Sequence, residues 1–297
     1  MAVVATGFFD GVHLGHRHVI DTLLRAARER GEQSVIVTFW PHPRTVLQSD
    51  ARTLRLLTTL QEKRDMLLQL GVDRVEVLDF SREFSRLSAE EYLRGYVVSR
   101  FGGSAIVLGY DNVIGSDRLS GTDAAELARS IGLDVISCDA VSLAEAGLTI
   151  SSTKVRAALE KGEVEAAAGM LGYRYRLHGV VVAGNRLGRT IGYPTANMQL
   201  YEPLKLVPAN GVYLVEVRTL GRWYYGMTNI GVRPTVSGAG VRTIETHILD
   251  FDEFIYGLDI TLDFISKIRD ERRFDSLDAL KVQLGEDAGE CRRIISK

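Results

Sequence analysis

The chain has 297 residues, of which 45% are hydrophobic and 25% charged, and its net charge is −2. This composition is ordinary for a globular protein, and the length is enough for about two domains. The near-neutral charge argues against a general binder of nucleic acid or of anionic membranes, although a specific nucleotide pocket needs only a few local charges. We therefore expect no nucleic-acid or membrane partner, while self-association is left open.

The absence of a long apolar run and the spacing of the two cysteines indicate where the protein is located and which state its thiols adopt. No apolar run approaches the ~20 residues that cross a bilayer, and the sequence enters a strand at once without a leader, so we expect a cytoplasmic protein. The two cysteines, Cys138 and Cys291, lie far apart in the sequence. They form neither a disulfide framework nor a zinc pattern, and a buried thiol is the expected role of Cys138.

The first part of the chain alternates apolar strands with amphipathic helices. The expected strands are 3–6, 34–40, 75–80, 105–110 and 133–137. The expected helices are 18–30, 60–70, 88–101, 122–131, 152–159 and 164–171. This alternation predicts βαβ units and a mostly parallel sheet, in which ligands bind beyond the carboxyl ends of the strands.

The pattern changes after Tyr173, where glycine and proline become frequent and short alternating runs appear. These runs lie at 178–183, 212–218, 223–230, 243–249 and 259–265. They predict a small antiparallel barrel or sandwich, followed by a helix over 276–295. We place the domain boundary between residues 172 and 173, which gives domains 1–172 and 173–297.

The run Gly7–His16, GFFDGVHLGH, directly follows the first apolar strand. A strand, a glycine-rich turn and a helix aim backbone N–H groups at phosphate. His13 and His16 stand where the helix should begin, and there they could hydrogen-bond a phosphate. The alternative is a plain turn with two surface histidines, but paired histidines at such a junction favour the phosphate interpretation.

A second polar stretch, 149–156, reads TISSTKVR and also opens a helix. Hydroxyl groups and free N–H groups at a helix start, with Arg156 one turn inside, form an anion site. An ordinary helix cap explains the same residues about equally well.

The run 184–197, GNRLGRTIGYPTAN, is the most specific pattern in the chain. Its glycines allow a close approach of the backbone to a ligand, while Thr195 and Asn197 offer oxygen ligands for a hard cation. A glycine-rich hairpin with a polar end would explain the glycines but not the Pro-Thr-Ala-Asn run.

Together these segments resemble the bacterial bifunctional riboflavin kinase/FMN adenylyltransferase family, also called FAD synthetases. In the first half the resemblance is carried by 3–16, 150–156 and Thr38–Pro43. In the second half it is carried by 184–197, Gly211–Tyr213, Asn229–Thr235, Glu245–Phe251, Tyr256-Gly257 and Ile268–Phe274. It implies a Rossmann-like α/β nucleotidyltransferase domain followed by a small antiparallel β-barrel riboflavin kinase domain with a C-terminal helix.

For the first domain, the resemblance implies that the phosphate of FMN attacks the α-phosphorus of ATP, giving FAD and pyrophosphate. Such chemistry needs alignment and charge neutralisation rather than a protein nucleophile. His13, His16, Ser152, Arg156 and Mg²⁺ would supply both. The ATP-binding positions implied here are Gly7, Phe8, Asp10, Gly11, Ser151, Ser152 and Thr153.

For the second domain, the resemblance implies phosphorylation of riboflavin to FMN by ATP. Glu245 is the implied catalytic base for the ribityl 5′-hydroxyl, and Thr195 and Asn197 fall on the metal-binding positions. Arg269 and Phe274 are implied to close the flavin pocket, although a surface arginine and a core phenylalanine are equally good interpretations. The implied ATP-binding positions are Gly184, Gly188, Arg189, Gly192 and Asn229.

The chain departs from the family at 109–115, which reads GYDNVIG where the family usually has Gly-x-Asp-Phe-x-Phe-Gly. Asn112 and Ile114 replace the two aromatic residues, while Asp111 is retained; Asp111 and Asn112 are counted with the flavin-binding residues. A riboflavin kinase with a weakened or altered nucleotidyltransferase domain is therefore an alternative to the two-activity enzyme. A non-catalytic flavin- or nucleotide-binding regulator is another, which the retained Glu245 and His13 disfavour.

Overall fold

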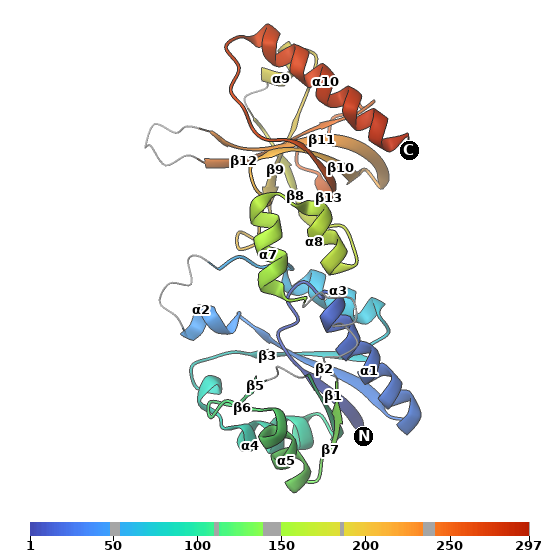
Figure 1. Cartoon of the computed structure of the whole chain (residues 1–297), viewed down its shortest axis with the longest axis vertical. Coiled ribbons are helices and arrows are strands. Elements are labelled where there is room, and N and C mark those ends of the chain that lie inside the picture. The colour runs from blue at the N-terminus through green and yellow to red at the C-terminus, as the bar shows by residue number, and fades with distance from the viewer. Residues whose placement is uncertain (48–53, 110–112, 139–149, 185–186, 234–240, 297) are drawn as a thin grey trace. The chain divides into compact units, whose positions relative to one another are not determined.

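The computed structural model describes residues 1–297 except 48–53, 110–112, 139–149, 185–186, 234–240 and 297 (Figure 1). The chain divides into two compact units, Met1–Ser152 and Thr153–Lys297. Each unit is described by itself below. The boundary proposed from the sequence, between residues 172 and 173, stays a prediction.

The first unit is built on a parallel sheet with the strand order β3-β2-β1-β4-β7. Its strands are β1 (Ala2–Thr6), β2 (Gln33–Trp40), β3 (Arg74–Asp79), β4 (Gly103–Leu108) and β7 (Asp134–Ser137). Its helices are α1 (Leu14–Arg30), α2 (Pro43–Leu47), α3 (Leu60–Gln69), α4 (Ala89–Tyr92), a π-helical continuation over Leu93–Arg100, and α5 (Gly121–Ser130). A short hairpin joins β5 (Val113–Ile114) to β6 (Leu119–Ser120). The predicted Rossmann-like class is confirmed.

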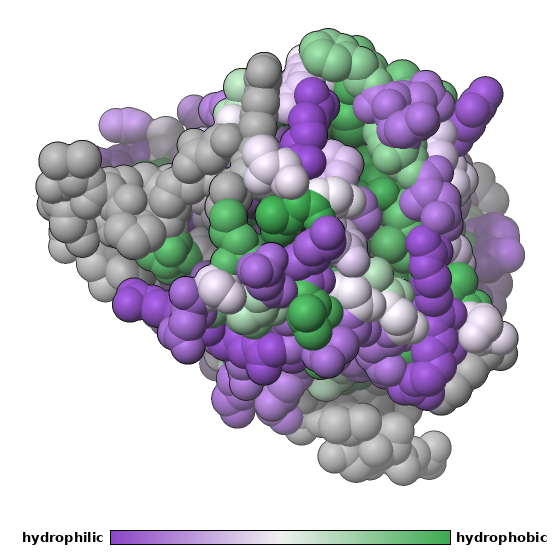
Figure 2. All heavy atoms as spheres, turned by 90° about the horizontal axis from the view of Figure 1, so that it is seen from above, coloured by the Kyte–Doolittle hydropathy of each residue, from purple (hydrophilic) through white to green (hydrophobic). Residues whose placement is uncertain are grey.

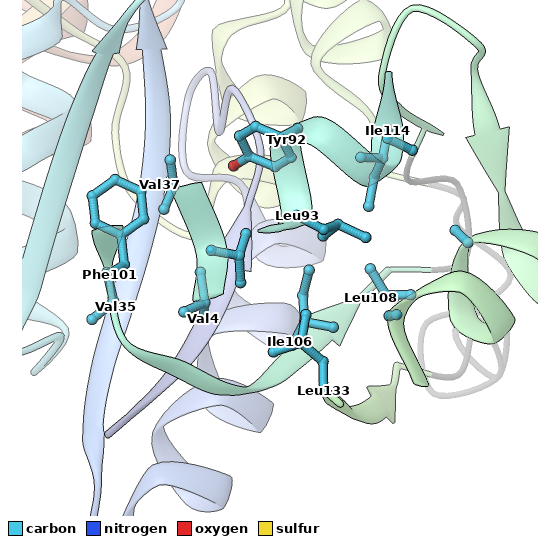
Figure 3. Packing of buried hydrophobic residues seen from close by; sticks show 14 of the residues in the cluster. Val4, Val35, Val37, Tyr92, Leu93, Phe101, Ile106, Leu108, Ile114 and Leu133 are labelled. Carbon is cyan, nitrogen blue, oxygen red and sulfur yellow. The ribbon is translucent and has the colours of Figure 1, made fainter. Parts of the chain in front are cut away.

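Alternate residues of the central strands bury opposite faces of this sheet, as the period of two in a strand requires. Val4 and Ile106 pack with Leu93 of the π-helical turn on one face, which Figure 3 shows from close by. Val3 and Ala105, one residue away in each strand, pack with residues of α1 and α3 on the other face. Both faces are therefore covered, which explains why the strands read as continuous apolar runs.

Helix α1 begins at Leu14, four residues before the start that the apolar spacing indicates. Its N-cap is His13, whose Nδ1 accepts the backbone N–H of His16 at 3.2 Å. Histidine is not among the usual capping residues, so the sequence pattern does not mark this start. The helix ends at Gly31, whose φ of 65° is the left-handed conformation that favours glycine.

In the second unit, strands close into an antiparallel barrel in the order β10-β11-β12-β9-β8-β13. The strands are β8 (Arg176–Val182), β9 (Ala196–Leu200), β10 (Gly211–Thr219), β11 (Arg222–Arg233), β12 (Val241–Ile248) and β13 (Asp259–Arg269). The accompanying helices are α7 (Ser152–Lys161), α8 (Val164–Leu171), α9 (Leu187–Thr190) and α10 (Leu277–Ile295). The barrel, rather than the sandwich, is the form adopted. Strand β9 is absent from the sequence-based expectation because it begins inside the polar Pro-Thr-Ala-Asn run, whose last two residues, Ala196 and Asn197, are its first two.

Helix α10 covers part of the outer surface of the barrel. Its Cys291 and Leu284 pack against Val212 and Leu214 of β10 and Met227 of β11. Figure 2 shows one face of the molecule, on which hydrophilic residues are interspersed with groups of hydrophobic ones. Among the residues that the structure describes, no helix combines the length and the apolar character that crossing a membrane requires.

Candidate active sites

The glycine-rich loop Gly7–His13 lies where the chain connectivity of the first sheet reverses. Strand β1 is central, with β2 parallel to it on one side and β4 parallel to it on the other. The connections from β1 and β4 therefore diverge, and sheets of this kind bind ligands beyond the carboxyl ends of the strands at such a point. Both the position and the turn agree with the phosphate-binding interpretation of the sequence.

The two histidines form a stacked pair at the start of α1. Their ring centroids are 3.6 Å apart and the rings are nearly parallel. A β-carbon on Gly15 would lie 3.2 Å from the ring of His13, so glycine leaves room for this stack. His13 is 5% exposed, and its position at the N-terminus of α1 places it among the unpaired N–H groups of the first turn.

Hydrogen bonding fixes where each ring carries its proton. Because Nδ1 of His13 accepts the His16 N–H, a neutral His13 ring has its proton on Nε2. Nδ1 of His16 is buried and has no hydrogen-bond partner in the described part of the chain. A proton at this atom would be unsatisfied, so the neutral His16 ring also carries it on Nε2. Each ring, when neutral, thus carries its N–H at Nε2.

The loop that leads into this pair holds three residues with positive φ within four positions. They are Phe9 (53°), Gly11 (81°) and Val12 (38°). For a β-branched or aromatic residue this backbone region is a genuine outlier. Such strain costs on the order of 1–3 kcal/mol per residue and persists only where the surroundings enforce it.

Asp10 provides one of the contacts that enforce the loop conformation. It is 3% exposed, and its carboxylate accepts hydrogen bonds from the backbone N–H groups of Leu57 and Thr58 at 3.0–3.1 Å. The Thr58 hydroxyl oxygen in turn accepts the N–H of Gly11 at 3.0 Å. Asp10 therefore joins the loop to the segment that leads into α3, and its side chain is engaged by protein groups.

Lys63 of α3 provides the second contact and was missed by the sequence analysis. Its side chain is almost fully buried at 1% exposure. Nζ donates to the carbonyl oxygen of Phe8 at 2.8 Å and to Oγ1 of Thr38 at 3.0 Å. Thr38 Oγ1 donates to the same Phe8 carbonyl at 3.1 Å. The only sequence signal would have been a lysine on the apolar face of a predicted helix.

The environment shifts two pKa values in this cluster. Burial lowers the pKa of Lys63 to about 8, and the carboxylate of Asp10 opposes the shift. Burial, followed by the charges of His13 and Lys63, holds the pKa of His16 well below 6.5. His16 is therefore neutral at physiological pH, in agreement with the Nε2–H form derived above.

For the other predicted residues of the first site, the structure gives fewer contacts. The hydroxyl group of Ser152 donates to the backbone carbonyl of Asp10 at 2.9 Å, so this part of the serine-rich stretch does lie at the loop. Thr153 and Arg156 belong to the second unit. Asp111 and Asn112 lie outside the described residues. The roles proposed for these four residues stay predictions.

A group of aromatic side chains lies near the carboxyl ends of β2 and β3. Phe39 is 5.8 Å from Phe80 and 5.7 Å from Phe84, measured between ring centroids. Tyr92 and Tyr96 are stacked at 5.8 Å, and the hydroxyl of Tyr92 is 2.9 Å from that of Thr6 at the end of β1. All but Tyr92 are half-buried, so this edge of the sheet offers aromatic surface. The sequence analysis did not connect these residues.

In the second unit, strand pairing aligns four of the predicted site residues in one row. Asn229 of β11 is directly opposite Glu245 of β12, which is directly opposite Asn197 of β9. On the other side of Asn229, Val212 of β10 is followed by Arg269 of β13. Directly opposed residues of a sheet point to the same face. These five residues, here called the site row, therefore share one surface of the barrel.

The site row lies on the outer face of the barrel. The residues next to it in sequence, Thr228 and Thr246, are fully buried and their hydroxyl oxygens are 2.8 Å apart. They point into the barrel, so Asn229 and Glu245 point outward. Val212, within the row, packs against α10. The functional groups of the row thus lie on the face that α10 partly covers.

The glycine-rich loop before β9 folds closely against this row. A β-carbon on Gly184 would lie 2.2 Å from the side-chain nitrogen of Asn197, and one on Gly188 equally close to the carbonyl oxygen of Tyr193. A larger residue at Gly184 would displace the Asn197 side chain, and one at Gly188 would displace the backbone of the loop. Gly184 is therefore explained by its contact with the row, Gly188 by a close approach within the loop, and Gly192 by its φ of 86°.

A pocket of about 310 Å³ adjoins the same loop. Thr195 and Arg189 line it, together with Phe251, Phe254 and Tyr256 from the segment after β12. Phe254 is 75% exposed and its ring centroid is 4.9 Å from that of Tyr256. Asp252 and Glu253 add charged groups to this lining. Apolar and aromatic walls combined with polar groups are typical of sites for flat organic rings.

Arg269 is held by α10. Its guanidinium donates to both carboxylate oxygens of Asp287 at 2.8–3.0 Å, and Gln283 donates to the same carboxylate at 2.8 Å. Asp287 is 2% exposed. The Phe274 ring lies 5.7 Å from the guanidinium carbon of Arg269. Asp287 and Gln283 were missed, because only the packing of α10 brings them to the barrel.

Comparison with known proteins agrees with this geometry. The family model of FAD synthetase matches residues 1–154, and that of riboflavin kinase matches residues 171–295. The bifunctional riboflavin kinase/FMN adenylyltransferase of Listeria monocytogenes is 37% identical, over 99% of this chain and 93% of its own. The protein of the same description from Escherichia coli K12 is 38% identical, over 96% and 90%. The chain belongs to the bifunctional riboflavin kinase/FMN adenylyltransferase family.

A solved structure extends the likeness to three dimensions. The crystal structure described as a macrolide-efflux protein from Streptococcus pneumoniae is 34% identical to this chain. The TM-score is 0.88, and the match covers 98% of this chain and 93% of that one.

The structure shows where Ile114, one of the two departures from the family pattern, is placed. Ile114 is 5% exposed and packs in the core of the first unit with Tyr92 and Leu93 (Figure 3). Its replacement of an aromatic residue is therefore a change of core packing, and it removes no exposed stacking surface. The position of Asn112, the other departure, lies outside the described residues.

Proposed function

We propose that this chain makes FAD in two steps, with riboflavin phosphorylated by the second domain and the resulting FMN adenylylated by the first. Both domains of the family are present. The observation that carries the proposal is the site row, which brings Glu245, Asn197 and Asn229 side by side on three neighbouring strands.

In the kinase step, we assign Glu245 as the general base. It takes the proton of the ribityl 5′-hydroxyl while that oxygen bonds to the γ-phosphorus of ATP and the bond to ADP breaks. Asn197 and Asn229 flank Glu245 directly. Their neutral amides leave the carboxylate without a like-charged neighbour in the row, and they can orient the hydroxyl and the phosphate.

A divalent cation fits beside this row. Thr195 and Asn197 offer neutral oxygen atoms, which suit Mg²⁺ when substrate phosphates and water complete its shell. The described residues hold no cluster of three or more His, Cys, Asp or Glu side chains that could bind a metal, which agrees with a cation that arrives with ATP. When bound, Mg²⁺ would offset the charge that develops on the transferring phosphate.

The pocket lined by Thr195 and Phe254 is the proposed site for the adenine of this ATP. Thr195 belongs both to the pocket and to the loop that carries the proposed cation ligands. A base in the pocket would thus place its phosphates toward Asn197 and Glu245.

In the adenylyl step, the proposed role of the first unit is alignment. A phosphate oxygen of FMN bonds to the α-phosphorus of ATP, and the bond to pyrophosphate breaks. His13 and His16 donate their Nε2–H groups, together with the N-terminus of α1, to the phosphate oxygens. The aromatic group around Phe39 and Phe84 provides the surface on which a flavin ring could pack.

A paired assay on one preparation tests the proposal. Riboflavin with ATP and Mg²⁺ should give FMN, and FMN with ATP and Mg²⁺ should give FAD and pyrophosphate. Glu245→Gln keeps the shape of the side chain but removes the base, so FMN formation should fall by about 10²–10⁴-fold, with FAD formation unchanged. His16→Ala should have the reverse effect.

Each substitution should leave the reaction of the other domain unchanged, and this retained activity shows that the rest of the variant protein is folded. Turnover of riboflavin without turnover of FMN in the unaltered protein would favour the kinase with a weakened adenylyltransferase domain. An unchanged rate of FMN formation by Glu245→Gln would contradict the assigned base.

A further inference from the structure

Lys63 is a buried charge that the proposed chemistry does not use. It lies on α3 at 1% exposure, behind the loop that carries the histidine pair. Its partners are the Phe8 carbonyl and the Thr38 hydroxyl, both within 3.0 Å. No proposed substrate group reaches it in the steps above. A buried lysine is costly, so its presence at this loop calls for a physical explanation.

We propose that Lys63 is a positioning residue for adenylyl transfer: it holds the Phe8 carbonyl and the Thr38 hydroxyl behind the phosphate loop and places a positive charge beside the histidine pair. This inference rests on the proposed adenylyltransferase function. It concerns a residue that acts through the loop and His16, without contact to the reacting atoms.

The first part of the role is geometric. The Phe8 carbonyl precedes the run of positive φ values at Phe9, Gly11 and Val12. It accepts hydrogen bonds from both Lys63 and Thr38, so its direction is fixed where the strained turn begins. The Phe8 ring is fixed too, because the Lys63 ammonium lies 3.8 Å from its centroid.

Asp10 and Lys63 each hold a different part of the turn. Asp10 ties the middle of the loop to the backbone of Leu57 and Thr58, while Lys63 ties its start to α3 and β2. Both contacts come from protein groups far away in sequence. Together they account for the persistence of a conformation that residues such as Val12 avoid on their own.

The second part of the role is electrostatic. Among the described residues, the charges that act on His16 are those of His13 and Lys63, and the charge that acts on Lys63 is that of Asp10. The Lys63 charge and the N-terminus of α1 both oppose a second positive charge on His16. A neutral His16 keeps its Nδ1 lone pair unprotonated and its Nε2–H free to donate.

The experiment compares Lys63→Met with Arg64→Met. Methionine is about as long as the carbon stem of lysine but lacks the ammonium group, with its charge and its N–H donors. Arg64 is the exposed residue that follows on the same helix. In protein with ¹⁵N-labelled histidine, the His16 ring is titrated by NMR. We expect the pKa of His16 to rise in Lys63→Met and to stay unchanged in Arg64→Met.

FAD formation is measured on the same variants across pH. We expect Lys63→Met to lower kcat by about 10²-fold, as for a misplaced reactive group, and to move the acidic limb of the profile to higher pH. Formation of FMN by the second domain should not change. Lys63→Arg retains the positive charge, so it should leave the His16 titration near that of the unaltered protein.

An alkaline readout keeps the proposal testable if Lys63→Met does not fold. Because the pKa of Lys63 is about 8, FAD formation should decline above that pH in the unaltered protein. In Lys63→Arg the decline should move to higher pH, since arginine stays charged. An unchanged decline in Lys63→Arg would overturn the proposal.

The outcomes separate this inference from the proposed function. Loss of activity in Lys63→Met with an unshifted His16 titration and an unmoved acidic limb would leave only a packing role and overturn it. If the unaltered protein makes no FAD, the proposed function fails, whereas the His16 titration still decides whether Lys63 sets its proton state.

Discussion

Asn197 and Glu245 are directly opposite each other across β9 and β12, with their side chains on the outer face of the barrel. Forty-eight positions separate them in the numbering of the printed sequence. The pairing joins the proposed cation ligand to the proposed base, so the transferred phosphate and the attacking hydroxyl would meet at this point of the sheet.

The first prediction concerns Asn197. Asn197→Ala removes an oxygen ligand for the cation next to Glu245, so riboflavin phosphorylation should need more Mg²⁺ and its kcat/KM should fall by about tenfold or more. Titration of the initial rate with Mg²⁺ measures this. Gln199→Ala, at an exposed position of the same strand, is the control and should behave as the unaltered protein. Equal Mg²⁺ dependence in both variants would contradict the assignment.

The second prediction concerns the clamp between α10 and the barrel. Asp287→Ala leaves the guanidinium of Arg269, whose side chain is 18% exposed, without its buried partner. Breaking a buried pair in this way costs about 3–5 kcal/mol. The free energy of unfolding of the second unit should fall accordingly in urea. Glu286→Ala, on the exposed side of the same helix, should change it little, and an equal effect of both would show that Asp287 has no special role.

The third prediction concerns Asp10. Asp10→Asn cannot accept all the hydrogen bonds that the carboxylate receives from Leu57 and Thr58. We expect a loss of about 1–3 kcal/mol in the stability of the first unit, together with reduced FAD formation. Asp21→Asn on the exposed face of α1 is the matched control. Full FAD formation by Asp10→Asn would mean that the turn keeps its shape without this contact.

The fourth prediction is the pH dependence of stability. Folding lowers the pKa of Lys63 from 10.5 to about 8, so between these values the unfolded chain binds more protons than the folded one. The Lys63 contribution to the free energy of unfolding should therefore rise with pH from about 8 to 10.5 and be constant below 8, where the buried charge costs about 3 kcal/mol.

Subtracting the urea unfolding profile of Lys63→Met from that of the unaltered protein isolates this contribution. Other groups that titrate in the same range cancel in the difference. A flat difference between pH 8 and 10.5 would mean that Lys63 is not desolvated in the folded protein.

The fifth prediction concerns Cys291. Burial, with Asp287 and Glu290 nearby, raises the pKa of its thiol to about 12. The reactive thiolate is therefore scarce at pH 8, and the side chain is fully buried. Iodoacetamide should modify Cys291 only as fast as the second unit opens, which mass spectrometry of quenched samples can follow. Rapid modification of the folded protein would show that α10 detaches readily from the barrel.

The sequence by itself determined the class of each unit and most of its local structure. Continuous apolar strands between amphipathic helices require a sheet covered on both faces, and Val3 and Val4 indeed bury opposite faces. The glycines of the run that begins at Gly184 predicted a backbone that lies close to other groups. The residues of the site row were also named from the sequence, because their motifs resemble those of a known family.

Only the tertiary structure decided how distant residues meet. Strand register placed Arg269, Asn229, Glu245 and Asn197 on one face, and a shift by one residue would have turned them inward. The capping role of His13 and the buried charge of Lys63 depend on a strained loop and on a helix packed behind it. The hydrophobic periodicity of a sequence predicts which face of a helix or strand is apolar. It does not predict which groups a polar side chain on that face will contact.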